Sequence, residues 1–108
     1  MTSPDSSRHT AACRIPADHP ALPGHFPGDP VVPGVLLLDR VIEAAEGWLG
    51  ALLRVRGVRQ AKFVAPLRPG EEARIVLALT ATSLEFTIER GAATLAKGSL
   101  AIDGTTAQ

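Results

Sequence analysis

The sequence predicts an α+β domain in which one helix covers one face of an antiparallel sheet. An apolar run from Val35 to Ile42 has the composition of a buried helix, and after Trp48 apolar residues alternate with polar ones, as they do in strands. A short stretch with the composition of a strand also precedes the helix. One strand, one buried helix and then a series of strands are typical of the α+β class.

Length and composition limit the chain to one domain. Its 108 residues, 45% of them apolar, provide a modest core that oligomerisation would enlarge. Eleven basic residues balance eleven acidic ones, so the net charge favours neither nucleic acid nor an anionic membrane as a partner. Cys13 is the only cysteine and the three histidines are scattered, so we expect no disulfide and no metal site.

Both ends of the chain are expected to lie outside the folded domain. Residues 1–9 are polar, lack the apolar stretch of a secretory signal and are predicted to be a disordered tail. Residues 10–103 are predicted to form the domain, and residues 104–108 to fray. No apolar run reaches the roughly 18 residues of a membrane span, so we expect a soluble, cytoplasmic protein.

The first two elements are a strand and the central helix. A strand is expected from Ala11 to Ile15, because Pro16 cannot continue it. The helix is expected to run from Pro33, which suits a first turn, to Glu46, with Gly47 as its stop. Charged residues that recur every three positions are expected to face solvent or a subunit boundary, and these are Arg40, Glu43 and Glu46.

Strands are expected to fill the rest of the chain. Residues 49–56 and 58–65 are predicted to form one strand that bends at Gly57, since glycine is typical of a bulge. After a turn at residues 66–70, apolar residues alternate in two further strands and the last strand covers residues 92–102. The residues expected on the buried face of the two middle strands are Ala73, Ile75, Leu77, Leu79, Leu84, Phe86 and Ile88.

Two titratable side chains are associated with the start of the helix. His25 lies on a loop that several prolines stiffen, because each fixes its own φ and restricts the preceding residue. Asp39 lies inside the apolar run of the helix, where a buried carboxylate requires a partner or a proton. His25 is the candidate partner of Asp39.

These residues carry a resemblance. The string His25-Phe26-Pro27-Gly28-Asp29-Pro30, then Pro33-Gly34-Val35-Leu36 and Asp39, resembles the active-site signature of the 3-hydroxyacyl-acyl-carrier-protein dehydratases. Lys62-Phe63, Pro66 and Pro69-Gly70 resemble the strand and turn that follow the helix in that family. The resemblance implies the hot-dog fold, a curved antiparallel β-sheet wrapped around one long central helix. The short chain is most similar to the branch acting in aryl-polyene pigment pathways.

The resemblance also implies a site. Dehydration needs a base for the C2 proton, an acid for the departing hydroxyl and a group that stabilises the enolate-like oxygen. The matching residues make His25 the candidate base and Asp39 the candidate acid, while the backbone N–H groups of Gly34 and Val35 would bind the thioester carbonyl. The family further implies that the histidine of one protomer works with the acid of its dimer mate.

A basic stretch follows the helix. Between Gly47 and Gly70 there are five basic residues and no acidic one, namely Arg54, Arg56, Arg59, Lys62 and Arg68. Because acyl carrier proteins are acidic, this stretch is a candidate docking surface. The alternative is a solvated strand face without a partner.

We therefore expect a dehydratase without a cofactor. Its substrate would be a 3-hydroxyacyl chain linked to the 4′-phosphopantetheine of an acyl carrier protein, and its product a trans-2-enoyl thioester for fatty acid or polyene biosynthesis. The assembly would be a homodimer or larger, or a hetero-oligomer with another hot-dog chain. Two alternatives are a hot-dog acyl thioesterase and a non-catalytic hot-dog subunit of an acyl-processing complex. Either His25 or Asp39 alone has an ordinary structural explanation, whereas the pair favours catalysis.

Overall fold

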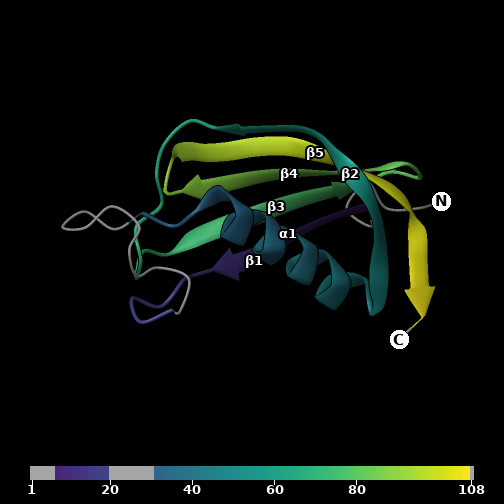
Figure 1. Ribbon diagram of the computed structural model, residues 1–108, viewed down its shortest axis with the longest axis horizontal. Helices are drawn as coiled ribbons and strands as arrows, with labels where there is room; N and C mark the ends of the chain where they lie inside the picture. Colours follow the sequence, from purple (N-terminus) through teal and green to yellow (C-terminus); the bar gives the residue numbers. More distant parts are fainter. Residues whose placement is uncertain (1–6, 20–30, 108) are drawn as a thin grey trace.

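Five strands form one antiparallel sheet, and a single helix packs against it (Figure 1). The computed structural model describes residues 7–19 and 31–107. The elements in chain order are β1 (Arg8–Cys13), α1 (Gly34–Leu49), β2 (Ala51–Phe63), β3 (Ala73–Leu79), β4 (Ser83–Arg90) and β5 (Ala93–Ala107). The strand order is β1-β3-β4-β5-β2, and each neighbouring pair is antiparallel.

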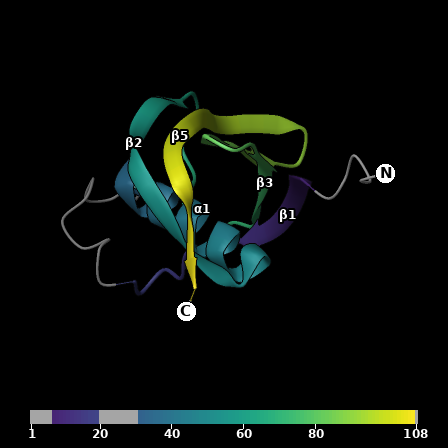
Figure 2. The same cartoon turned by 90° about the vertical axis from the view of Figure 1, so that its right-hand side faces the viewer.

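The sheet curves around the helix, as the view along the strands shows (Figure 2). Leu77, Leu84 and Leu100 project from the concave face of the sheet and are fully buried. Val41 and Ala45 fill the other side of this core from α1. Each buried leucine or valine side chain of this core contributes roughly 1.5–3 kcal/mol to the free energy of unfolding. The arrangement confirms the predicted hot-dog fold.

The helix is longer than the sequence predicted. It continues through Gly47 to Leu49, and Gly50 ends it with a φ of 66° while donating its N–H to the Glu46 carbonyl at 2.9 Å. The prediction that Gly47 stops the helix is therefore wrong. Packing explains the difference, because Trp48 in the last turn stacks on the ring of His9 with centroids 5.2 Å apart. This contact offsets the cost of about 1 kcal/mol for a glycine inside a helix.

Strand β1 begins earlier, and strand β5 ends later, than the sequence predicted. Strand β1 begins at Arg8, which pairs with Ala78, and ends at Cys13, so it includes two residues assigned to the tail. Residues 1–6 of the predicted tail lie outside the described residues. Strand β5 continues to Ala107, which pairs with Ala51, so the expected fraying of residues 104–107 is wrong. The start of β2 supplies the backbone partners for this extension.

The middle strands follow the predicted pattern. Strand β2 is one continuous strand whose register shifts on both sides of Gly57, which confirms the expected irregularity there. Of the residues predicted to face the core, all are buried except Leu79, which is half-buried. Alternation along β3 and β4 therefore identified the concave face of the sheet correctly.

Strand β2 forms one edge of the sheet and leaves apolar side chains exposed. Val55, Val58 and Phe63 stand opposite buried residues of β5 and so point to the concave face. They remain 37%, 52% and 46% exposed, and Val35 on the first turn of α1 is 69% exposed. We call these four residues the β2 apolar surface. Helix α1 touches this surface only at its start, where the ring of Phe63 lies against Gly34, and leaves Val55 and Val58 exposed on the concave face.

Candidate active site

A cavity of about 400 Å³ opens at the start of α1. It is lined by residues 31–34, by Leu37 and by residues 63–67, which lead from the end of β2 into the following turn. Every lining side chain among the described residues is apolar or aromatic, which suits a hydrocarbon chain better than a charged ligand. Two segments distant in sequence thus meet at one end of the helix.

Of the two predicted backbone donors, Gly34 lines this cavity and Val35 follows it in the first turn of α1. Leu36 and Leu37 donate their N–H groups to the Pro33 carbonyl at 3.1 and 3.3 Å, so the N–H groups of Gly34 and Val35 precede the first intrahelical bonds. Pro33 provides no side-chain cap, and the first turn carries no acidic residue. Among residues 7–19 and 31–107, neither a side-chain cap nor an acidic residue of the first turn neutralises the positive end of the helix dipole, which would favour a carbonyl oxygen that gains negative charge.

The carboxylate of Asp39 lies on the exposed side of α1. Leu36, Leu37, Val41 and Ala45 face the core, whereas Asp39 is exposed. The expectation that Asp39 is buried among leucines is therefore wrong for the single chain. The helical spacing explains this result, because Asp39 lies two positions after Leu37 and two before Val41, which places it on the opposite side of the helix from the stripe that packs against the sheet.

The exposed stripe of the helix also differs from the prediction. Glu43 is exposed as expected, whereas Arg40 and Glu46 are half-buried. Arg40 pairs with Glu43 at 3.7 Å, and a carboxylate oxygen of Glu46 accepts the N–H of Leu53 at 2.8 Å. Arg40, the cation next to Asp39 in sequence, thus pairs with Glu43.

His25 lies outside the described residues, which resume at residue 31. Its pairing with Asp39 therefore stays a prediction. The structure does describe both segments between which the histidine loop runs, Ile15–His19 and the start of α1. Gly70 donates its N–H to the carbonyl of Ile15 at 2.8 Å, so the turn after β2 fixes the point where this loop leaves β1.

The five basic residues do not form one patch. Arg54 and Lys62 lie eight positions apart on β2, about 25 Å for an extended strand. Arg54 donates to the hydroxyl of Thr106 at 2.7 Å, and Arg59 donates to the carbonyl of Thr82 at 3.3 Å. Only Lys62 and Arg68 are next in sequence to residues that line the cavity, and Lys62, opposite Lys97 of β5, points to the convex face of the sheet.

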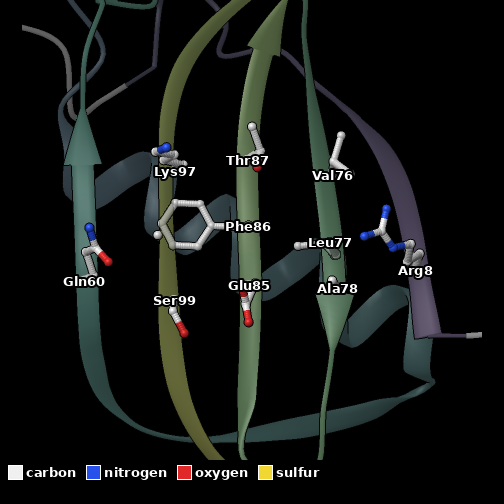
Figure 3. A pocket seen from close by; sticks show the side chains of 11 residues that line it. Arg8, Gln60, Val76, Leu77, Ala78, Glu85, Phe86, Thr87, Lys97 and Ser99 are labelled. Atoms are coloured by element: carbon white, nitrogen blue, oxygen red, sulfur yellow. The ribbon is translucent and has the colours of Figure 1, made fainter.

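A second hollow, of about 410 Å³, lies on the convex face of the sheet (Figure 3). Its rim carries Arg8, Glu85 and Lys97, and α1 passes behind the strands in this view. The mixed charges of this rim give no reason to expect an acyl chain there. Of the predicted site residues that the structure describes, Gly34, Val35 and Asp39, none lines it. The cavity at the start of α1 is therefore the candidate active site.

Other features of the described residues add no further chemistry. No group of three or more His, Cys, Asp or Glu side chains in residues 7–19 and 31–107 could hold a metal ion. Burial raises the pKa of the Cys13 thiol; Arg40 lowers it to a smaller extent and Glu43 raises it further, so this thiol is a poor nucleophile. Within the same residues no helix is long and apolar enough to cross a membrane.

Comparison with known proteins agrees with this geometry. The profile of the ApeI-like family, described as ApeI dehydratase, matches residues 2–99. The 3-hydroxyacyl-[acyl-carrier-protein] dehydratase FabZ of Thermus thermophilus is 39% identical in an alignment 75 residues long that covers 62% of this chain and 53% of that protein. The chain thus spans about half the length of this curated relative.

Solved structures share the fold. The dehydratase heterocomplex ApeI:P from Xenorhabdus doucetiae contains a chain that matches with a TM-score of 0.81 at 22% identity, over 94% of this chain and 91% of that one. A probable thioesterase from Bartonella henselae matches with a TM-score of 0.68 at 19% identity, over 89% and 88% of the two chains. At these identities the matches show a common fold, which serves more than one activity.

Proposed function

Since the chain belongs to the ApeI-like dehydratase family, we propose that it removes water from 3-hydroxyacyl thioesters carried by an acyl carrier protein. The observation that carries this proposal is the apolar cavity at the start of α1, next to helix N–H groups that have no intrahelical acceptor. An acyl chain would fill the cavity, and its thioester carbonyl would accept hydrogen bonds from Gly34 and Val35. The product would be a trans-2-enoyl thioester for fatty acid or polyene biosynthesis, made in the cytoplasm.

The elimination then needs two side chains. His25 would take the proton from C2, and the electrons would form an enolate whose oxygen the N–H groups of Gly34 and Val35 stabilise. Asp39 would give a proton to the C3 hydroxyl, so that the C3–O bond breaks, the C2–C3 double bond forms and water leaves. Both residues would return to their starting states when the proton passes from His25 back to Asp39.

We propose that two copies of the chain share each site. The β2 apolar surface and the unpaired edge of β2 would be buried if two β2 strands paired across a two-fold axis. Asp39 shares the exposed side of α1 with Val35, a member of this surface, so pairing would enclose Asp39 at the subunit boundary. The second catalytic group would then be His25 of the partner subunit.

A second hot-dog chain is the alternative partner. The described part of β2 carries Arg54, Arg56, Arg59 and Lys62 and no acidic residue, so pairing two copies would bring like charges together. A related chain with an acidic edge strand would avoid this repulsion. The relative from Xenorhabdus doucetiae is itself called a heterocomplex. Native mass spectrometry of the purified chain, alone and with such a partner, distinguishes the two assemblies.

Carrier docking is proposed for the rim of the same cavity. Lys62 and Arg68 adjoin the lining residues, so an acidic carrier protein bound there would present its pantetheine arm to the cavity. Arg54, at the other end of β2, is too distant to contribute to that contact. The proposed docking surface is therefore smaller than the one predicted from all five basic residues and is centred on Lys62 and Arg68.

Incubation of the purified protein with a 3-hydroxyacyl carrier protein, followed by mass spectrometry, tests the proposed activity. Loss of one water from the carrier-bound chain supports the dehydratase. Release of free acid would support the thioesterase alternative instead, and an unchanged substrate would support a non-catalytic subunit. An Asp39→Asn variant serves as the control, because it should leave the substrate unchanged if the chain is a dehydratase.

A further inference from the structure

We propose that Arg90 and Glu71 are positioning residues for this reaction, because together they fix the cavity wall against the start of α1. The inference rests on the proposed function and adds two residues whose side chains do not line the cavity. Arg90 ends β4, and Glu71 follows the turn after β2. With the carbonyl of Pro66 they form a unit that we call the Arg90 clamp.

The clamp is a compact set of charge-assisted hydrogen bonds. One guanidinium nitrogen of Arg90, Nη1, donates to the carbonyl of Pro66 at 3.0 Å and to Oε1 of Glu71 at 2.8 Å. The same carboxylate oxygen accepts the backbone N–H of Arg68 at 2.8 Å, and Glu71 donates its own N–H to the Arg68 carbonyl at 3.2 Å. These bonds close the turn at residues 66–71 and attach it to the sheet.

The turn at residues 66–71 also fixes the entry to the helix. Leu67, one residue after Pro66, is 1% exposed, and its carbonyl accepts the N–H of Val32 at 2.8 Å. Val32 is also buried and immediately precedes Pro33, from which α1 starts. A continuous path of hydrogen bonds and covalent bonds thus leads from Arg90 to the N–H groups that would bind the thioester oxygen.

Global stability is a poor explanation for the clamp. The side chains of Arg90 and Glu71 are 34% and 35% exposed, and ion pairs with this much solvent contribute little to the free energy of unfolding. Local geometry is a better explanation, because a displacement of about 1 Å in a catalytic group can cost roughly 100-fold in rate. Pro66 and Leu67 line the cavity, and Leu67 is bonded to Val32, so losing their anchor would shift the part of the wall beside the start of α1.

The same sheet contains a matched control. Nη2 of Arg74 donates to a carboxylate oxygen of Glu89 at 3.1 Å and to the carbonyl of Gly91 at 2.7 Å. This pair therefore has the same chemistry as the clamp, one guanidinium nitrogen shared between a carboxylate and a carbonyl. Neither Arg74 nor Glu89 lines the cavity at the start of α1.

The test compares Arg90→Gln with Arg74→Gln, using dehydration kinetics and amide hydrogen exchange at Val32. Arg90→Gln should lower kcat by about 10- to 100-fold with KM within about twofold, because the carbonyl-binding groups move while the rest of the cavity remains. Exchange at Val32 should become faster. Arg74→Gln should change neither kcat nor the exchange rate at Val32, even if both variants lower the melting temperature by the same amount. Arg90→Lys should recover part of the lost kcat.

Equal effects of Arg90→Gln and Arg74→Gln on kcat and on Val32 exchange would overturn the proposal, as would wild-type values of both in Arg90→Gln. If Arg90→Gln does not fold, Glu71→Gln replaces it, since the glutamine keeps the shape but loses the charge. Unchanged kcat and unchanged Val32 exchange in Glu71→Gln would then overturn the clamp. A wild-type protein that dehydrates nothing would refute the proposed function, while the exchange measurement would still decide the clamp.

Discussion

The aromatic ring of Phe63 lies against Gly34, so that a Cβ added to Gly34 would stand 2.9 Å from Cζ of that ring. The two residues come from the end of β2 and the first position of α1. A glycine at this position lets the ring, or a bound thioester, approach the helix backbone closely. The end of β2 and the start of α1 therefore form one structural unit around the cavity.

Replacing Gly34 with alanine should affect activity more than stability. The ring of Phe63 is partly exposed and can move aside, and alanine favours the helix, so we expect a melting temperature close to wild type. The added methyl group would occupy the approach to the backbone N–H groups, so kcat should fall by about tenfold or more. Phe63→Leu in the same background relieves the clash without removing the methyl group. Recovery of wild-type kcat in this double variant would show that the ring, not the thioester, needs the glycine.

The two predicted catalytic side chains should be needed for turnover but not for folding. His25→Ala and Asp39→Asn should each lower kcat by about 100-fold or more, since each removes a proton-transfer group. Because Asp39 is exposed in the single chain, its replacement should leave the melting temperature nearly unchanged. Kinetics and thermal melts of the same preparations check both statements. Retained activity together with a large loss of stability would contradict the assignment.

Charge reversal on β2 should depend on position along the strand. Lys62→Glu, beside the cavity, should raise KM for the carrier-bound substrate but not for a small pantetheine thioester, because only the carrier presents an acidic surface. Arg54→Glu is the matched control at the far end of the strand and should leave both KM values unchanged. If Lys62→Glu raises KM equally for both substrates, Lys62 affects binding in the cavity and not binding of the carrier protein.

The contribution of Glu71 to stability should depend on pH. The backbone N–H of Arg68, and secondarily Arg90, lower the pKa of Glu71 below its ordinary value of 4.5. A lowered pKa in the folded state means that this contribution is present above the unfolded-state pKa and is lost as pH falls through the folded-state pKa. Urea unfolding between about pH 6 and pH 3 should thus show wild type and Glu71→Gln converging at the acidic end. A constant difference across this range would contradict the lowered pKa.

Local patterns were sufficient for most of the fold. Alternation along β3 and β4 and the apolar composition of α1 identified the core, because these signals depend on residues a few positions apart. The end of the helix was misplaced because Trp48 is held by His9, nearly forty positions away in the chain. The C-terminal extension of β5 was missed for the same reason, since its polar residues pair with the start of β2.

In the site, too, local sequence signals predicted some features, whereas contacts between distant residues could not be predicted. Gly34 and Val35 could be singled out from the sequence because their motif is contiguous with the helix start; Gly34 lines the cavity, and the binding role of both residues stays a prediction. Asp39 was predicted to be buried because the run of apolar neighbours hides which side of the helix it occupies. Arg90 carried no signal at all, because its partners Pro66 and Glu71 are about twenty positions upstream and only the folded sheet brings them together.

We propose that His25 of one protomer and Asp39 of its dimer mate form one active site. Mixing inactive His25→Ala with inactive Asp39→Asn under conditions of subunit exchange tests it most directly. Each heterodimer would hold one doubly mutated site and one wild-type site, so random exchange should restore roughly a quarter of wild-type activity. Activity that stays at the level of the single variants, with exchange verified by native mass spectrometry, would contradict the shared site.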